Sequence, residues 1–270
     1  MPTINTNVNA LFAQNALKVN DRNMTKAMQQ LSTGSKVNSS SDDAAGLSSA
    51  TSMTAQIKGM NQAVRNANDA ISMLQTAEGA MTEQTNMLQR MRELAVQATT
   101  ATYNTTQLGY LDTEFQALDT QINNIASNTK WNGSTVIAST ATKSFVVGAA
   151  GTETISVTLT ATDTTTLATT SLVVSSASSA ATAVTAIDTA LASISSARAA
   201  IGAGINQLTY AADNLTNISA NMQASRSQIM DTDYATATSN LARAQIIQQA
   251  ATAMLAQANQ APASVLALLK

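Results

Sequence analysis

The sequence predicts a mainly α-helical protein: a long antiparallel helical hairpin or coiled-coil rod, with paired terminal helices and a small central β-hairpin element. Two observations support this fold class. On both sides of the middle of the chain, apolar residues recur about every 3.5 residues, which keeps one stripe of a helix facing a partner. Between these seams, residues 139–188 are rich in Thr, Ser, Ala and Val and include a run of alternating apolar and hydroxyl side chains, which is typical of a β-strand.

The composition of the 270 residues excludes several kinds of site. The chain has no cysteine and no histidine, which excludes a thiolate nucleophile, a Ser-His-Asp relay, a disulfide and an ordinary zinc or haem site. Its 14 basic and 16 acidic residues give a net charge of −2, which argues against a nucleic-acid-binding surface. We therefore predict no enzymatic activity, no catalytic residue, no metal and no cofactor.

The sequence predicts neither membrane insertion nor a cleaved signal peptide. It contains no run of about 18 apolar residues of the kind that spans a bilayer. Residues 1–7 (MPTINTN) lack the basic region, apolar region and cleavage site of a secretory signal. Taken alone, this absence suggests a cytosolic protein.

The two ends of the chain, residues 4–31 and 241–269, are predicted to be helices with few large apolar side chains. Ordering the backbone costs about 1–2 kcal/mol per residue, whereas a well-buried Leu or Ile returns about 1.5–3 kcal/mol. We therefore expect both ends to be mobile in the free subunit and to become ordered when neighbouring copies bury them. Pro262 cannot donate a backbone hydrogen bond, so we expect it to kink or break the C-terminal helix.

Two longer apolar seams flank the middle of the chain. The first contains Met53, Ile57, Met60, Val64, Ala67, Ile71 and Leu74 and continues more loosely through Met81, Leu88, Met91 and Ala95. The second contains Ile187, Leu191, Ile194, Ile201, Ile205, Leu208, Ala212, Leu215, Ile218 and Met222. Such residues also suit the core face of an ordinary helical bundle, but about six heptads on each side favour two paired helices.

A turn is predicted between the N-terminal helix and the first long seam. Gly34 suits the position just after the end of a helix. Asp42 and Asp43, which follow three serines, are suited to cap the next helix, because its free N–H groups and positive dipole end attract carboxylates. A metal or acid–base site is the alternative interpretation, but no third ligand lies nearby in the sequence.

The middle of the chain is predicted to form a β-hairpin. Glycine-containing residues connect the apolar run 144–147 to the alternating run 154–160. Residues 162–179 are low in charge and rich in small and β-branched side chains. A further strand pair, a loop and an exposed polar cover all fit this second segment.

Several longer motifs occur in order along both flanks. They are LSTGSKVN at 31–38, DDAAGL at 42–47, LQRMRELAVQA at 88–98, IASNTKWNGS at 125–134, AADNLTNI at 211–218 and SRSQIMDTDY at 225–234. Together with the Asn-rich start and AQANQ at 256–260, they resemble bacterial flagellin, the flagellar filament subunit, over about residues 1–138 and 185–270. The resemblance implies a compact form of this family with a short central variable region.

The resemblance also implies a division of the chain into three parts. Residues 1–42 and 232–270 correspond to an inner coiled coil of terminal helices. Residues 43–138 and 185–231 correspond to a helical rod domain. Residues 139–184 correspond to a short variable region that contains the β-hairpin and the Thr- and Ser-rich sequence.

The function implied by the resemblance is that of a structural subunit that self-assembles into the hollow helical filament used for swimming motility. Its implied partners are further copies of itself, the flagellar cap and hook-junction proteins and a flagellin export chaperone. Flagellins leave the cell through the flagellum's own type III export channel without a cleaved signal peptide, so the implied location is extracellular. We expect five leucines to be buried assembly contacts: Leu11, Leu31, Leu241, Leu255 and Leu269.

The rod domain of the family also carries a site recognised by Toll-like receptor 5 of animal innate immunity. Its key arginine, leucine and glutamate match Arg90, Leu94 and Glu114 in this sequence. Gln89 and Glu93 match neighbouring contact positions. Packing between subunits is the alternative role for these side chains, and the two roles are compatible.

Two other functions fit part of the sequence. A hook–filament junction protein shares the terminal helices but does not build long filaments. A coiled-coil adhesin or binding rod fits the periodicity but not the order of the motifs.

Overall fold

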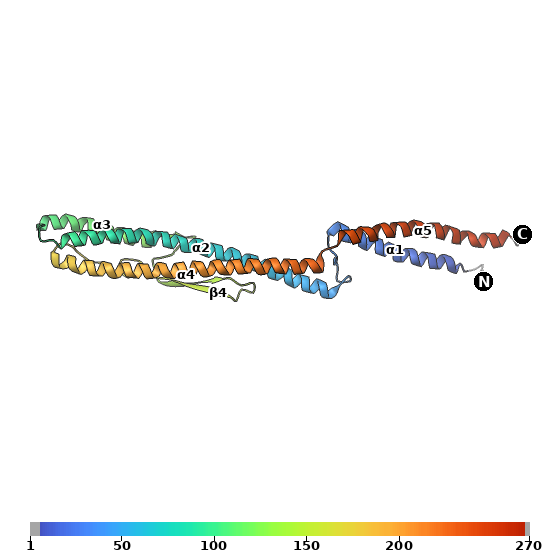
Figure 1. The fold of residues 1–270 in the computed structure, drawn as a ribbon, viewed down its shortest axis with the longest axis horizontal. Helices are drawn as coiled ribbons and strands as arrows, with labels where there is room; N and C mark the ends of the chain where they lie inside the picture. Colours follow the sequence, from blue (N-terminus) through green and yellow to red (C-terminus); the bar gives the residue numbers. More distant parts are fainter. Residues whose placement is uncertain (1–5, 268–270) are drawn as a thin grey trace. The chain divides into compact units, whose positions relative to one another are not determined.

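The computed structural model describes residues 6–267, with side chains up to Gln260, and confirms the mainly α-helical fold class. Its elements are α1 (Val8–Thr33), α2 (Ala44–Ala98), α3 (Thr105–Asn128), β1 (Lys130–Trp131), β2 (Ser134–Thr135), β3 (Ala141–Val146), β4 (Thr154–Leu159), α4 (Ala177–Met230) and α5 (Tyr234–Ala267). They form two compact units (Figure 1). The terminal unit contains the described residues up to Ala55 and from Asn221 onward, and the central unit contains Gln56–Ala220.

The core of the central unit lies between α2, α3 and α4, which run side by side (Figure 1). The buried residues of α4 follow a heptad repeat in which Ile or Leu is separated by small residues. They are Ala180, Ala183, Ile187, Ala190, Ile194, Ala197, Ile201, Gly204, Leu208, Ala212, Leu215 and Ser219. The matching stripe of α2 includes Ala67, Ala70, Leu74, Ala77, Met81, Leu88 and Met91. The prediction of long helices paired along heptad seams is therefore confirmed.

The seam of α4 differs in detail from the one predicted from the sequence. Leu191 and Ile205 are only partly buried and Ile218 is 40% exposed, whereas the adjacent Ala190 and Gly204 are buried. Small side chains let helix backbones approach closely, so they occupy the closest contacts and larger neighbours lie at the edge of the interface. The sequence prediction favoured large apolar residues. At these points it therefore placed the seam one residue away from the residues that are buried.

A buried amide links α2 to the rest of the central unit. Gln84 is fully buried, and its Nε2 donates to the carbonyl oxygens of Ile122 in α3 (3.2 Å) and Thr162 (3.1 Å). α3 itself begins with a capping box, in which Asn104 and Gln107 each accept a hydrogen bond from the backbone N–H of the other. The bond from Gln84 to Ile122 thus ties α3 to α2 through a polar contact.

Two short antiparallel hairpins follow α3. β1 pairs with β2 around Asn132 and Gly133, whose φ angles of 47° and 81° both lie in the left-handed region that a tight Asn-Gly turn requires. β3 pairs with β4 over six residue pairs, from Ala141 with Leu159 to Val146 with Thr154. The predicted central β-hairpin is therefore confirmed.

Two glycines provide space for the β3–β4 hairpin on the helices. A Cβ on Gly59 of α2 would lie 2.6 Å from the backbone oxygen of Ala149, in the turn of the hairpin. A Cβ on Gly204 of α4 would lie 2.6 Å from Cγ2 of Val157 in β4. Real Cβ atoms do not approach other atoms so closely, so the hairpin packs where α2 and α4 have no side chain.

Residues 162–176 form a loop of turns, which decides between the three structures that the sequence left open. The loop packs against α3: Asp112 accepts a hydrogen bond from the backbone N–H of Val174 (2.8 Å), and Gln116 donates one to the carbonyl oxygen of Leu172 (2.6 Å). The segment is not an exposed cover, because several of its side chains are buried: Thr162, Thr164, Leu167, Thr169 and Val174.

Burial raises the pKa of Asp119, an α3 residue beside this loop, although a hydrogen bond with Thr169 acts in the opposite direction. The folded protein thus favours the protonated carboxyl, so this contribution to stability is greatest below the ordinary pKa of about 3.9 and falls as pH rises through the higher folded pKa. Asp119→Asn should therefore raise the free energy of unfolding at pH 7 by about 1 kcal/mol, or Tm by about 2–4 °C. Thermal denaturation at pH 7 and pH 3 measures this effect, and an equal difference at both pH values would contradict its cause.

The terminal unit contains the antiparallel pair of α1 and α5 (Figure 1). Gly34, with φ of 68°, ends α1, and its carbonyl oxygen accepts a hydrogen bond from the N–H of Thr232 (3.0 Å). Pro262 was expected to kink or break the C-terminal helix; α5 continues through it to Ala267, so the expectation of a break is wrong. A proline removes one backbone hydrogen bond, and the helix on either side of it remains intact.

Among the described helices, α4 is long and apolar enough to cross a membrane by length and composition alone. A packed core helix meets the same criterion. The buried heptad stripe of α4 faces α2 and α3, so its apolar residues already have partners within the central unit.

Candidate functional site

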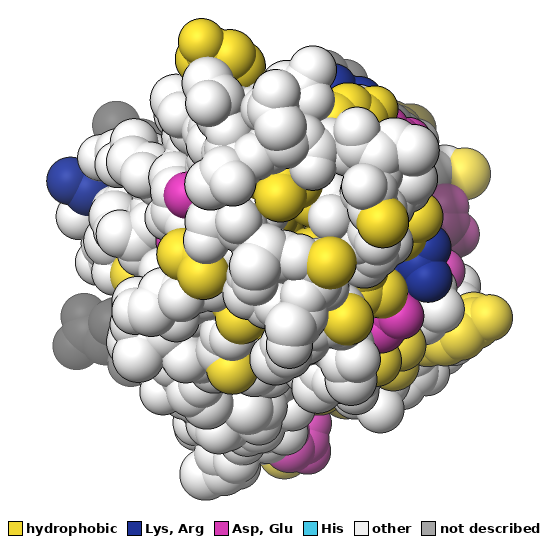
Figure 2. All heavy atoms as spheres, turned by 90° about the vertical axis from the view of Figure 1, so that its left-hand side faces the viewer, with side chains coloured by type: hydrophobic (Ala, Val, Ile, Leu, Met, Phe, Trp, Pro, Cys, Tyr) yellow, Lys and Arg dark blue, Asp and Glu magenta, His cyan; other side chains and the backbone are white. Residues whose placement is uncertain are grey.

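The surface offers little charge to direct association. Only 11% of the residues are charged, against about 25% in an average soluble domain. On the face shown in Figure 2, hydrophobic side chains lie between uncharged polar ones, with few charged side chains among them. The surface therefore offers mainly apolar and uncharged polar groups to another molecule.

Many large apolar side chains of the terminal helices are exposed and do not pair α1 with α5. Phe12 is 70% exposed, and the side chains that the pair buries are small or polar: Ala10, Asn20, Ala27, Ala237 and Ala244. We call the exposed set the terminal apolar surface; it contains Val8, Leu11, Phe12, Val19, Met28, Ile246, Ile247 and Met254. Eight exposed large apolar side chains on one helix pair make this surface a candidate site of interaction with another molecule.

The five predicted assembly contacts occupy different environments. Leu11 is 51% exposed and belongs to the terminal apolar surface. Leu31, Leu241 and Leu255 are half-buried between the helices and solvent, and Leu269 lies outside the described residues. Phe12 and Ile246 were not among the predicted contacts, although both are more exposed than Leu11. Both residues lie beside the alanine-rich stripe of their helix and not on it. This position in the sequence could have identified them.

A second candidate site, the Arg90 cluster, joins α2 to α3. Arg90 donates to Glu114 of α3 (Nε–Oε1 3.0 Å) and to Glu93 one turn along α2 (Nη1–Oε2 3.1 Å). The Glu114 carboxylate, and then that of Glu93, raise the pKa of the Arg90 guanidinium. All three side chains are exposed, so the cluster is a charged surface feature whose ion pairs contribute little to stability.

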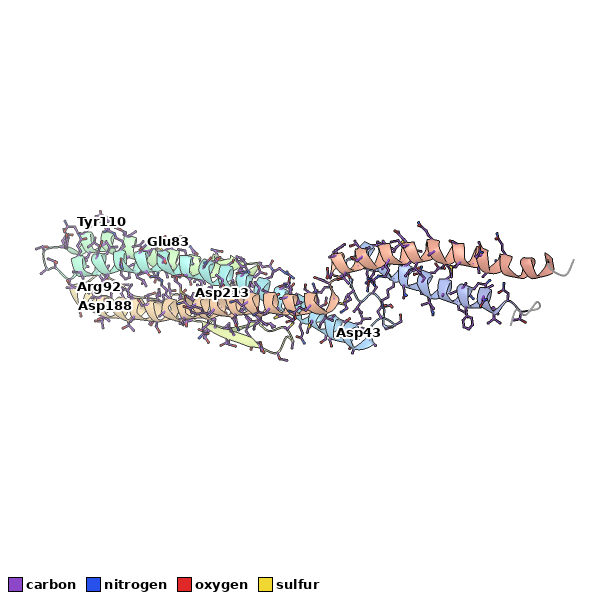
Figure 3. The ribbon with its side chains drawn as sticks, turned by 45° about the vertical axis from the view of Figure 1, so that its right-hand side comes forward. Asp43, Glu83, Arg92, Tyr110, Asp188 and Asp213 are labelled. Atoms are coloured by element: carbon purple, nitrogen blue, oxygen red, sulfur yellow. The ribbon has the colours of Figure 1, made fainter. Side chains whose placement is uncertain are left out.

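The other residues matched to the receptor site lie around this cluster. Gln89 is exposed beside Arg90, whereas Leu94 is 1% exposed and packs in the core of the central unit. Arg92 points toward α4 and pairs with Asp188 (Nε–Oδ1 2.7 Å), as Figure 3 shows. The structure thus brings four of the five matched residues to the surface and places the leucine beneath them.

Asp42 and Asp43 occupy the turn between α1 and α2. Asp43 Oδ1 accepts the backbone N–H of Gly46 in the first turn of α2 (2.9 Å). Asp42 pairs with Lys26 of α1 (2.8 Å) and also accepts the backbone N–H of Ser39 (3.3 Å). The Lys26 hydrogen bond is the main reason that the pKa of Asp42 lies below its ordinary value. Across residues 6–267, no three His, Cys, Asp or Glu side chains gather in a way that would hold a metal.

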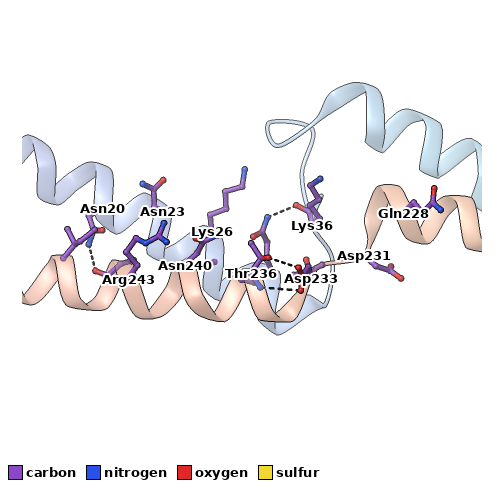
Figure 4. A pocket seen from close by; sticks show the side chains of 16 residues that line it. Asn20, Asn23, Lys26, Lys36, Gln228, Asp231, Asp233, Thr236, Asn240 and Arg243 are labelled. Carbon is purple, nitrogen blue, oxygen red and sulfur yellow. Dashed lines mark hydrogen bonds between the residues drawn. The ribbon is translucent and has the colours of Figure 1, made fainter.

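A polar groove of about 610 Å³ lies along the terminal helix pair near this turn. Figure 4 shows its lining, in which Asn20 reaches across from α1 to bond the backbone of α5. Charged groups of both signs line the groove: Lys26, Lys36, Arg243, Asp231 and Asp233. Thr236 lies in the first turn of α5. The hydrogen bond that its side chain donates to Asp233 is the main reason that the pKa of Asp233 lies below its ordinary value.

Comparisons of the sequence place both flanks of the chain in one family. Residues 4–142 match the bacterial flagellin N-terminal helical region, and residues 184–269 match the bacterial flagellin C-terminal helical region. The chain is 41% identical to a flagellin of Halalkalibacterium halodurans over 99% of both proteins. It is 32% identical to flagellin B of Vibrio cholerae, and the alignment covers 98% of this chain and 99% of that protein.

Solved structures agree with this assignment. A crystal structure of Bacillus cereus flagellin is 32% identical, with a TM-score of 0.50 over 60% of this chain and 94% of that one. A flagellar hook-associated protein from Vibrio parahaemolyticus reaches a TM-score of 0.61 over 70% of this chain, but at 13% identity it shows a likeness of fold alone. By its sequence and its fold, this chain belongs to the bacterial flagellin family.

Proposed function

We propose that this chain is the structural subunit of a bacterial flagellar filament used for swimming, and that it polymerises through the terminal apolar surface. The observation that carries this proposal is the exposure of many large apolar side chains of α1 and α5. Burying such surface against another copy contributes roughly 25 cal/mol per Å². A contact between different patches of two copies that does not close on itself generates an open helix. The family is a structural one, and the proposal involves no catalysis.

The proposal assigns a layer of the filament to each part of the chain. Residues 1–42 and 232–270 form the inner coiled coil, residues 43–138 and 185–231 form the rod domain around it, and residues 139–184 form a thin variable region. The subunit leaves the cell through the flagellar type III channel without a cleaved signal peptide and resides in the extracellular filament. Its further partners are an export chaperone, the flagellar cap and the hook-junction proteins.

Electron microscopy of the purified protein in high salt tests this function. We expect long filaments of uniform diameter, and we expect removal of residues 232–270 to abolish them while most of the helix content of the central unit remains. Filaments of the truncated protein would contradict the assembly role of α5. Soluble dimers of the full chain would instead favour a coiled-coil binding rod, and short oligomers would favour a hook–filament junction protein.

As a second function, we propose that the Arg90 cluster is recognised by Toll-like receptor 5. Three of the matched residues, Arg90, Glu93 and Glu114, form one exposed group, which supports a shared contact surface. Leu94 is buried, so its role is to hold α2 in place beneath this group.

A receptor reporter assay with soluble, unpolymerised protein tests this second function. Arg90→Ala should reduce the response at least about tenfold, because truncating an arginine at the centre of an interface has a large effect. Arg92→Ala is the matched control, since it removes an exposed ion pair with Asp188 from the same helix. No response to the unmutated protein, or an equal loss with both variants, would contradict the assignment.

A further inference from the structure

The most deeply buried side chains between α1 and α5 are small or polar, whereas the larger apolar side chains on the same faces are only half-buried: Leu17, Met24, Leu31, Leu241 and Leu255. The side chains that this interface buries are four alanines and one polar residue, Asn20, which is 6% exposed. The packing of alanines changes little when one helix slides along its partner. Alanine contacts therefore specify the alignment of the two helices only weakly. A polar residue in a helix pair, by contrast, can specify one alignment.

Asn20 makes a direct bond across the pair. Its Nδ2 donates to the backbone oxygen of Ala244 in α5 at 2.8 Å (Figure 4). A shift of one helical turn would bring this buried amide against Leu241 or Gln248 instead of Ala244, because residues three or four positions apart share a helix face. The small side chain of Ala244 is what lets the amide reach the backbone.

Two other contacts keep the same alignment on either side of Asn20. Toward the N-terminus, Nδ2 of Asn7 donates to the backbone oxygen of Ala258, also at 2.8 Å. Toward the loop, Ser35 and Asp231 form an antiparallel β-bridge. The three contacts lie at the two ends and in the middle of the pair, and they agree on one register.

We propose that Asn20 and Asn7 are positioning residues that fix the register of α1 against α5, whose apolar side chains are only partly buried by the pair. One register presents the exposed apolar side chains of both helices to neighbouring copies in a single geometry. The consequence for assembly rests on the proposed filament function. The role of the two asparagines in the helix pair does not depend on it.

The absence of cysteine from the chain makes a direct test simple. Asn15 of α1 and Gln249 of α5 are exposed, so Asn15→Cys and Gln249→Cys would carry two spin labels. Labelled subunits would be diluted into filaments of unlabelled protein, and the distance between the labels would be measured together with the critical concentration for assembly. Circular dichroism would check that each variant keeps its helix content.

We expect one narrow distance distribution for the otherwise unmutated protein. Asn20→Ala, and more strongly the double variant with Asn7→Ala, should broaden it or shift it by about one turn, roughly 5 Å. The critical concentration should rise about fivefold for each lost hydrogen bond. Asn23→Ala is the matched control, since Asn23 is an exposed asparagine of the same helix, and it should leave both measurements unchanged.

Asn20→Leu separates alignment from simple packing. If position 20 only needed to fill space, leucine would restore a narrow distribution and normal assembly, and either that result or an unchanged distribution with Asn20→Ala would overturn the proposal. If the unmutated protein forms no filaments, the proposed function is wrong. The same distances are then measured in soluble subunits under conditions in which circular dichroism shows that the terminal helices are formed, with the same pattern expected and the same results overturning it.

Discussion

Phe12→Asp should abolish filament formation while the central unit of the subunit remains folded. Phe12 is 70% exposed in the single chain, so a carboxylate at this position does not disturb the pairing of α1 with α5. When a neighbouring copy covers the position, the carboxylate must lose its hydration, and an unpaired buried charge costs several kcal/mol. Since every 1.4 kcal/mol is a tenfold change in affinity, the critical concentration should rise at least about 100-fold. Sedimentation over a range of protein concentrations measures it.

Phe12→Leu is the control for this experiment, because leucine keeps the position apolar. It should change the critical concentration by less than about tenfold, as expected for a swap that retains apolar character. Equal losses with Asp and Leu would show that the ring shape, not apolar burial, is needed. Normal assembly of Phe12→Asp would show that the position stays in contact with water in the filament.

Gly59→Ala should destabilise the central unit, although alanine is normally favoured over glycine within a helix. The added Cβ would lie 2.6 Å from the backbone oxygen of Ala149, and backbone cannot move aside as the end of a long side chain can. Overpacking of this kind costs about 1–3 kcal/mol, which exceeds the gain of up to about 1 kcal/mol from helix propensity. Thermal denaturation should show Tm lowered by several degrees, since 1 kcal/mol corresponds to about 2–4 °C.

Gly79→Ala in the same helix is the matched control. Nothing lies within 4 Å of a Cβ at Gly79. This variant should therefore be stabilised by the higher helix propensity of alanine, and its Tm should rise. Gly204 and Gly202 form an equivalent pair on α4, where the contact at Gly204 is with Val157 and Gly202 faces open space. Stabilisation by all four substitutions would mean that the hairpin does not pack against the helices in solution.

The fold class followed from the sequence because heptad spacing and alternation are properties of the chain itself. Ile187, Ile194 and Ile201 are buried at the expected interval, and the alternating run pairs with its neighbour as β4. The role of Ala190 and Gly204 was missed, because their importance arises only when two backbones approach closely. The loop structure of 162–176 was not predictable either, since it depends on contacts with α3 such as that of Asp112 with Val174.

The candidate sites were predictable to different degrees. The sequence identified Arg90 and Glu114 through motif resemblance, but their contact joins two helices whose alignment no local pattern specifies. Leu94 was matched to a recognition site, and its burial became apparent only with the packing of α2 in the core. The importance of Asn20 could not be predicted from the sequence. Nothing in the sequence around an asparagine of a helix indicates which backbone carbonyl its side chain will bond.

The outward apolar side chains of α1 and α5 also determine how association should respond to temperature. Removing apolar surface from water lowers the heat capacity, and near 25 °C its driving force is almost entirely entropic. Association through Phe12, Ile246 and Met254 should therefore weaken as the solution is cooled. A surface with few charges has no comparable electrostatic term to offset that loss. The expected temperature dependence of association thus follows from the apolar side chains that α1 and α5 expose.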